Sequence, residues 1–266
     1  MSKQKFHEKH PYLFVIILEL IIIVVALIAG TITFMLKLPE YTLYGITMVI
    51  LAIITSLILL KMDWWKTIGF QRFKKKHLLL LIIPVIPLIG NLFGTFNSIG
   101  LGFYIYYFFM CLFVGFVEEG IYRGIMLQTL LKKGVWKAVI ISSLLFSLSH
   151  IMNALAGWNW SHVLLQLTYS FAIGFGWSAF ALRTRTIWPL MIIHFLIDFF
   201  SFIKAENIIK SLQSSQSDIK GIVYSLILSV IFIVYGIVVT KSFIKEKRNK
   251  ACNKQDSEQP TIPVPQ

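Results

Sequence analysis

The chain has 266 residues, of which 57% are hydrophobic and 14% charged, whereas soluble domains carry about a quarter charged residues. This composition excludes a soluble globular enzyme and a disordered protein. The mean hydropathy is +0.76 and several apolar runs approach the roughly 20 residues of a bilayer crossing, so the sequence predicts an all-α, polytopic membrane protein. The formal net charge is +13, but no nucleic-acid-binding motif accompanies it, and we expect no nucleic-acid partner.

Eight apolar runs bounded by charged or turn residues each predict a membrane-spanning helix. They cover residues 13–36, 42–60, 78–96, 102–131, 137–156, 162–182, 187–203 and 219–240. An even number of spans places both termini on one side. Twenty of the 25 Lys and Arg residues then fall on that side, four on the opposite side and one, Arg123, within a span. Because cytoplasmic loops carry the excess of basic residues, we expect both termini in the cytoplasm.

The same pattern predicts three parts of the chain. Residues 1–12 form a cytoplasmic leader, residues 13–240 form the membrane domain, and residues 241–266 form a polar, Pro-ending tail that we expect to be disordered. The first apolar run is longer than the core of a cleaved signal peptide, so we expect it to stay as an anchor. The predicted location is the cell membrane, with multiple crossings.

Ionisable side chains inside the spans are the first candidates for function, because a charge at the centre of a bilayer costs at least about 2.5–3.5 kcal/mol. Three runs contribute them: Glu118, Glu119, Arg123, His150, His194 and Asp198. At a helical rise of about 1.5 Å per residue, Glu118, His150 and Asp198 each lie roughly 20 Å from the nearest basic cytoplasmic residues. We therefore predict that three helices present these groups to one interior cavity.

Spacing within each helix suggests roles for these groups. Glu119 and Arg123 are four residues apart, so they share a helix face and can pair as structural support. Glu118 points about 100° away from Glu119, which leaves it chemically available. His194 and Asp198 are also four apart, so Asp198 is placed to orient the imidazole or to act beside it.

A carboxylate and two imidazoles in a wet cavity fit the activation of a water for hydrolysis, by either of two routes. In the metal route, Glu118, His150 and His194 bind Zn²⁺ or another divalent metal, since two His and one carboxylate form a known zinc ligand set. In the metal-free route, Glu118 and His150 deprotonate the water while His194 and Asp198 stabilise the oxyanion. Asp198 must be protonated to donate to that oxyanion. The residues themselves leave both routes open.

These residues resemble the motifs of CPBP intramembrane proteases, a family named for CAAX proteases and bacteriocin-processing enzymes and also called the Abi family. Its motifs Glu-Glu-x-x-x-Arg, Phe-x-x-x-His and His-x-x-x-Asn/Asp match Glu118-Glu119 to Arg123, Phe146 to His150 and His194 to Asp198. Order, spacing and placement in successive apolar runs agree over roughly residues 100–205. The remaining spans and the tail carry no motif of the family.

The resemblance implies a membrane endopeptidase of about eight helices, with Glu118, His150, His194 and Asp198 catalytic and Glu119 and Arg123 supporting them. It implies a membrane protein or peptide as the substrate: prenylated CAAX proteins in the eukaryotic branch, and peptide maturation, bacteriocin self-immunity or signalling in bacterial relatives. At the position of Asp198, the resemblance to eukaryotic CAAX proteases implies Asn. This departure weakens the transfer of the CAAX substrate class.

Three alternatives compete with a protease. The polar groups can form an interhelical hydrogen-bond network that only fixes packing. The chain can be a catalytically silent immunity or regulatory protein that binds a partner in the membrane. It can also be a proton-coupled transporter, although the inverted repeats typical of such carriers are not visible. Lone polar residues in the spans, Glu19 among them, are expected to serve packing or the interface.

Overall fold

The computed structural model describes residues 5–93, 96, 99–204 and 219–258, which form helices joined by turns, as predicted. In chain order the helices are α1 (Phe6–Lys9), α2 (Pro11–Met35), α3 (Glu40–Met62), η1 (Lys75–Leu81), α4 (Ile82–Leu92), α5 (Leu101–Glu118), η2 (Glu119–Met126), α6 (Leu127–Leu130), η3 (Leu131–Lys133), α7 (Val135–Ser149), α8 (Met152–Leu155), α9 (Trp160–Thr184), α10 (Trp188–Phe202) and α12 (Ile219–Glu258). Here η1 and η3 are 3-10 helices and η2 is a π-helix.

Seven helical stretches of the described chain are long and apolar enough to cross a membrane. They coincide with seven of the eight predicted spans: Pro11–Met35, Thr42–Met62, Lys75–Leu92, Leu101–Lys133, Val135–Leu155, Trp160–Thr184 and Ile219–Asn253. The remaining predicted span, 187–203, forms α10, which has 15 residues and is therefore roughly 22 Å long. This length falls short of the roughly 30 Å hydrocarbon core, so the prediction of eight full spans is confirmed only in part.

The start of α10 is fixed by the chain reversal that follows α9. Arg185 ends α9 in the left-handed conformation, with φ at 59°. Pro189 then occupies the first turn of α10, a position where its missing N–H costs no hydrogen bond. The sequence predicted this reversal, because Arg183, Thr184 and Arg185 interrupt the apolar runs at this point.

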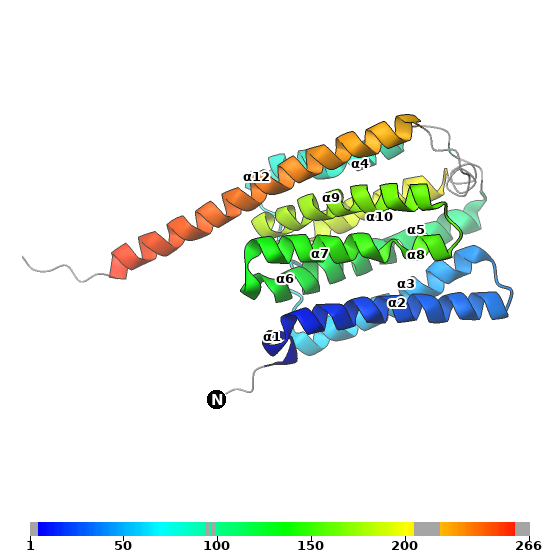
Figure 1. Ribbon diagram of the computed structural model, residues 1–266, viewed down its shortest axis with the longest axis horizontal. Coiled ribbons are helices and arrows are strands. Elements are labelled where there is room, and N and C mark those ends of the chain that lie inside the picture. Colours follow the sequence, from blue (N-terminus) through cyan, green and yellow to red (C-terminus); the bar gives the residue numbers. More distant parts are fainter. Residues whose placement is uncertain (1–4, 94–95, 97–98, 205–218, 259–266) are drawn as a thin grey trace, which may run out of the picture.

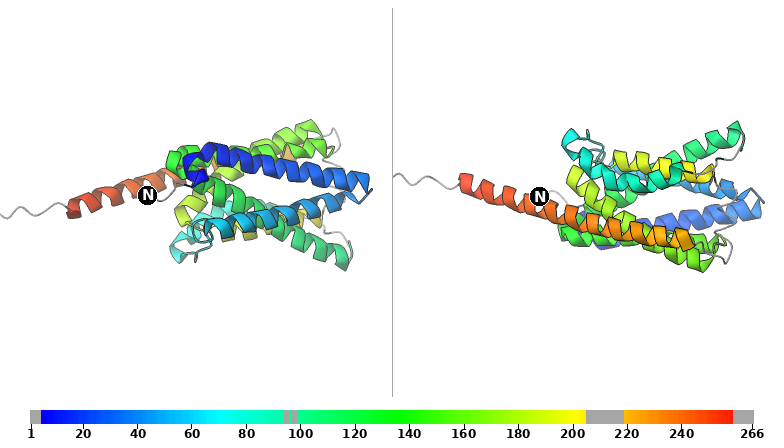
Figure 2. Two further views of the ribbon diagram at one scale, coloured as in Figure 1. Left: turned by 90° about the horizontal axis from the view of Figure 1, so that it is seen from below. Right: turned by 90° about the horizontal axis from the view of Figure 1, so that it is seen from above.

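The long helices run side by side, with α12 packed along α9 and α10 packed against α5 (Figure 1). The N-terminal helix α1 and the final turns of α12 lie at the same end of the bundle, and α12 projects beyond the other helices there (Figures 1 and 2). That both termini lie on one side of the membrane stays a prediction. That this side is the cytoplasm stays a prediction from the basic residues.

The polar tail is helical where the structure describes it. We predicted disorder from residue 241 onward, but α12 continues without a break to Glu258; residues 259–266 lie outside the described residues. The polar stretch is rich in Lys and Glu, which are good helix formers. Glu246 holds it locally, through an i,i+4 pair with Lys250 at 2.7 Å and an ion pair with Arg183 of α9. Polar composition alone was therefore a poor guide to order here.

Glycines on α9 bring its backbone close to the neighbouring helices. A Cβ added to Gly176 would lie 2.6 Å from Cδ1 of Phe232 on α12. A Cβ on Gly174 would lie 3.1 Å from Cδ1 of Phe146 and 3.2 Å from Nη2 of Arg123. Small residues at helix contacts are typical of membrane proteins, and Gly174 provides the space that two motif side chains occupy.

Candidate active site

The helix that begins as α5 changes its hydrogen-bonding pattern at the Glu-Glu motif. Glu118 is the last residue of α5, and Glu119 is the first of the π-helix η2, all eight residues of which are buried. π-helical turns are rare and frequently occur at functional sites. The wider turn changes the angular spacing that an α-helix would give to the motif, so the α-helical geometry assumed from the sequence holds only up to Glu118.

The predicted pair of Glu119 and Arg123 is present and fully buried. Arg123 Nη1 donates to Glu119 Oε1 at 3.0 Å, and both side chains are 0% exposed. The guanidinium carbon also lies 3.9 Å from the ring centroid of Phe146 and 5.5 Å from that of Trp177. Cation–π contacts of this kind are strongest where the cation is removed from water. Arg123 is therefore held by one carboxylate and two aromatic faces.

Glu119 does more than pair with Arg123. The same oxygen, Oε1, lies 2.9 Å from Nδ1 of His194 on α10. Since a carboxylate only accepts hydrogen bonds, Nδ1 carries the proton of this contact. Glu119 thereby fixes the orientation of the imidazole, a contact between helices that sequence spacing did not predict.

The other imidazole nitrogen of His194 faces two carboxyl groups. Nε2 lies 3.6 Å from Oε2 of Glu118 and 3.6 Å from Oδ2 of Asp198. Both distances exceed a direct hydrogen bond. Oε2 of Glu118 is buried and has no hydrogen-bond partner among the described residues. The structure thus gathers the predicted residues Glu118, His194 and Asp198 around one point, with the Glu118 carboxylate left free there.

His150 lies at the edge of this group. It directly follows α7, and its backbone N–H caps the helix end by bonding to Ser147. Its ring centroid is 5.1 Å from that of Phe146, which in turn is 6.3 Å from the ring of His194. In the described part of the chain, no hydrogen bond or ion pair joins His150 to Glu118. Phe146 therefore packs against both imidazole rings.

The residues named for a metal do not form a metal-binding group in this arrangement. The described residues contain no group of three or more His, Cys, Asp or Glu side chains that could hold a metal ion. The expected set of Glu118, His150 and His194 is not among such groups, and the His150 ring packs on Phe146 with their ring centroids 5.1 Å apart.

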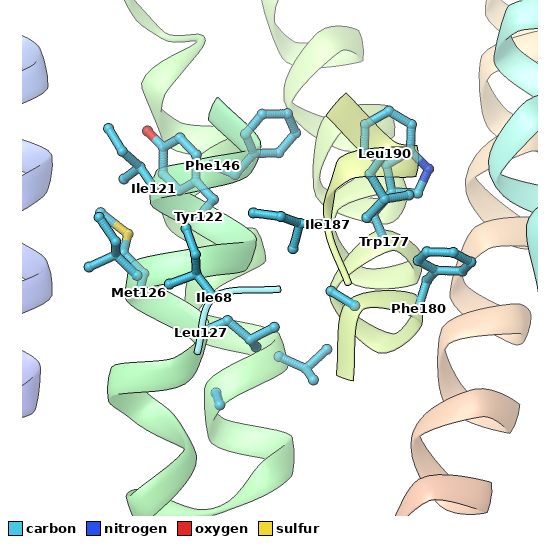
Figure 3. Close-up of a cluster of buried hydrophobic side chains, with 14 of the residues drawn as sticks. Ile68, Ile121, Tyr122, Met126, Leu127, Phe146, Trp177, Phe180, Ile187 and Leu190 are labelled. Atoms are coloured by element: carbon cyan, nitrogen blue, oxygen red, sulfur yellow. The ribbon is translucent and has the colours of Figure 1, made fainter. Parts of the chain in front are cut away.

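Two residues near the site were not predicted from the sequence. Trp177 of α9 places its ring 5.5 Å from that of His194, and Tyr122 places its ring 5.3 Å from that of Phe146. Figure 3 shows Tyr122 and Phe146 next to each other, with Trp177 on the neighbouring helix. The Gly-x-Gly pattern at residues 174–176 was the available signal that α9 packs closely here.

The comparison with protein families agrees with this geometry. Residues 100–200 match the family model described as type II CAAX prenyl endopeptidase Rce1-like. This stretch is an Rce1-like domain of the CPBP family. The Rce1-like domain runs from α5 to α10 and contains all six predicted site residues, whereas α2, α3, α4 and α12 lie outside it. Neither a search of curated proteins nor a search of solved structures found a match.

Membership of this family has two consequences. The family is one of hydrolases, and an Rce1-like domain implies an intramembrane protease. The long apolar helices fit that implication, since seven stretches of the described residues have the length and composition of membrane spans.

Proposed function

We propose that this chain is an endopeptidase that hydrolyses a peptide bond of a membrane-associated protein or peptide. The observation that carries the proposal is the position of Oε2 of Glu118, which has no hydrogen-bond partner among the described residues and lies 3.6 Å from Nε2 of His194. Glu118 belongs to a helical stretch that is long and apolar enough to cross a membrane. A base with no competing hydrogen-bond donor, next to a fixed imidazole, suits the activation of a water.

In the proposed reaction, Glu118 removes a proton from the attacking water. The hydroxyl oxygen forms a bond to the carbonyl carbon of the scissile peptide, and the carbonyl π electrons move to its oxygen. When the tetrahedral intermediate collapses, the C–N bond breaks, and the proton held by Glu118 passes to the leaving amine. His150 lies in the same region of the site, beside Phe146, and assists through the water rather than by direct contact with Glu118.

His194 and Asp198 are proposed to stabilise the oxyanion. Nδ1 of His194 is occupied by Glu119, so only Nε2 can donate to the substrate, and it does so when the ring carries both protons. The Glu119 carboxylate balances the charge of that imidazolium. Asp198 lies next to Nε2 and contributes a second hydrogen bond when it is protonated. Donors fixed in advance at the developing charge are a large source of rate enhancement.

The substrate class is proposed more broadly than the family's name suggests. Prenylated CAAX proteins are one candidate, and bacterial peptides that mature, signal or confer bacteriocin immunity are another. Asp198 in place of Asn favours the second group, because an aspartate changes the donors that surround the scissile bond. We place the protein in the cell membrane with both termini in the cytoplasm, as the distribution of basic residues suggests.

The test is a comparison of peptides in membranes that contain the native chain or Glu118→Gln. We expect at least one membrane-associated peptide to accumulate uncut in the variant, and the new terminus that is missing there to identify the cleaved bond. Glu246→Gln is the matched control, because Glu246 is a carboxylate on α12 outside the site. The control should process the same peptide as the native chain.

Two results would contradict the proposal. One is an identical set of peptide termini in the native and Glu118→Gln membranes. The other is a cellular phenotype that Glu118→Gln supports fully at native expression, which would favour a silent immunity or regulatory protein.

A single added methyl group should separate the two halves of this site. A Cβ on Gly115 of α5 would lie 2.6 Å from the backbone oxygen of Met191 and 3.3 Å from the nitrogen of Phe195. Because these are backbone atoms of α10, Gly115→Ala must move α10 and its His194 away from Glu118. We expect a decrease in kcat of about a hundredfold, the effect of roughly a 1 Å misplacement, measured on the peptide identified above.

The control for this substitution lies on the same helix. A Cβ on Gly102 would have no atom within 4 Å, so Gly102→Ala should leave kcat unchanged. Equal kcat values for the two variants would show that the α5–α10 contact does not set the catalytic distance.

A further inference from the structure

A carboxyl group from outside the Rce1-like domain reaches the neighbourhood of the site. Glu19 of α2 accepts a hydrogen bond from the Tyr122 hydroxyl at 3.1 Å, across 103 positions of sequence. Glu19 is 8% exposed and Tyr122 is 2% exposed. In Figure 3 the Tyr122 hydroxyl points away from Phe146, toward the blue ribbon of the N-terminal region. Glu19 is thus buried in the bundle, and its partner is a residue of the π-helix η2.

Tyr122 connects Glu19 to both imidazoles through one aromatic ring. The ring of Tyr122 packs edge-on against that of Phe146, with centroids 5.3 Å apart. Phe146 contacts the ring of His150 at 5.1 Å and that of His194 at 6.3 Å. A change in the position of Tyr122 therefore reaches the two residues proposed to work on the water and the oxyanion.

Burying Glu19 is costly, which argues that it serves more than packing. Its other oxygen, Oε1, is buried without a hydrogen-bond partner in the described part of the chain, and an unsatisfied buried polar group costs free energy. A leucine would fill this place in an apolar helix more cheaply. The hydrogen bond to Tyr122 is the contact that distinguishes the carboxylate from such a leucine.

We propose that Glu19 is a positioning residue, which fixes Tyr122 and, through Phe146, the two imidazoles of the active site. The inference rests on the proposed endopeptidase function and extends it. It makes α2 a functional part of the enzyme, although the family match begins only at residue 100. Glu19 acts here as a hydrogen-bond acceptor and does not take part in the chemical step.

The test uses three single variants and one double variant, assayed on the peptide identified by the membrane comparison. Glu19→Met keeps the side-chain length and removes the strong acceptor, and Tyr122→Phe removes the donor. Each should lower kcat about tenfold with KM unchanged, the effect of losing one hydrogen bond in the site. Glu19→Gln retains an acceptor oxygen and should stay within about twofold of the native kcat. Because Glu19 acts through Tyr122, the double variant that combines Glu19→Met with Tyr122→Phe should lower kcat about tenfold and not a hundredfold.

Thr33→Val is the matched control for a structural effect. Thr33 is a buried polar residue of the same helix, and its hydroxyl has no hydrogen-bond partner among the described residues. The variant should keep the native kcat. An equal decrease in Thr33→Val, a native kcat in Glu19→Met, or a hundredfold decrease in the double variant would each overturn the proposal.

A second measurement does not depend on cleavage. In the ¹⁵N-histidine NMR spectrum of the full chain in detergent micelles, the side-chain resonances of His150 and His194 should shift in Glu19→Met and stay in place in Glu19→Gln. If the native chain cleaves no peptide, the proposed function fails, and these resonances alone decide whether Glu19 positions the imidazoles. Unshifted resonances in Glu19→Met would overturn the inference.

Discussion

Glu118→Gln should lower kcat by a factor of about 10²–10⁴ and leave the protein folded and inserted in the membrane. Removal of a general base has this size of effect. The amide has nearly the same shape as the carboxylate but cannot take a proton from the attacking water. Because Oε2 of Glu118 has no hydrogen-bond partner among the described residues, the substitution removes little structural support. The measurement is single-turnover cleavage, together with thermal unfolding followed by circular dichroism.

Glu8→Gln provides the matched comparison. Glu8 is a carboxylate of α1, outside the membrane-spanning stretches, and it pairs with Lys132 at 2.8 Å. The hydrogen bond from Lys132 keeps the pKa of the Glu8 carboxyl below the ordinary value. The variant should cleave at the native rate. A Glu118→Gln protein that retained more than a tenth of the native kcat would remove Glu118 from the role of base, whatever the result for Glu8.

The sequence identified the parts of the site whose partners lie close along the chain. Glu119 and Arg123, and likewise His194 and Asp198, are four residues apart on one helix, and helical geometry brings such pairs together. Both pairs are present in the structure. Apolar runs likewise located the long helices, because a bilayer crossing requires a run of known length.

Contacts between helices could not be predicted from the sequence. The contact of Glu119 with His194 depends on which side chains of η2 point toward α10. In a π-helical turn these are not the side chains that an α-helix would present. Glu19 was interpreted as a packing residue because its own helix offers no polar partner. Its partner, Tyr122, lies on a helix that only the folded bundle brings near α2.

The end of the last helix, α12, was also predicted wrongly, because composition was the only signal there. Residues 241–258 are polar, and we interpreted polarity as disorder, but Lys, Glu and Arg favour a helix that has already begun. In α12 the helix starts in the apolar run and needs no new nucleation to continue, and nucleation is the costly step of helix formation. The chain reversal before α10, in contrast, was predicted, because Arg183 and Arg185 separate two apolar runs there.

Arg123→Met should destabilise the protein by about 3–5 kcal/mol, the cost of removing one partner of a buried ion pair. Glu119 would stay 0% exposed and would keep only His194 as a partner for its charge. Phe146 and Trp177 would lose the cation that lies against their rings. We expect a lower Tm in detergent and a loss of activity that follows from misplaced imidazoles. Met is chosen because it preserves the apolar volume of the arginine stem.

Arg183→Met is the control that separates burial from charge. Arg183 pairs with Glu246 between α9 and α12, and its side chain is 25% exposed. Partly solvated pairs contribute about 0–1 kcal/mol, so this variant should unfold near the native temperature. If both arginine variants lowered Tm equally, the stability of η2 would not depend on the burial of Arg123. If Arg123→Met unfolded like the native protein, the pair with Glu119 would serve the orientation of His194 alone, and its loss would appear only in kcat.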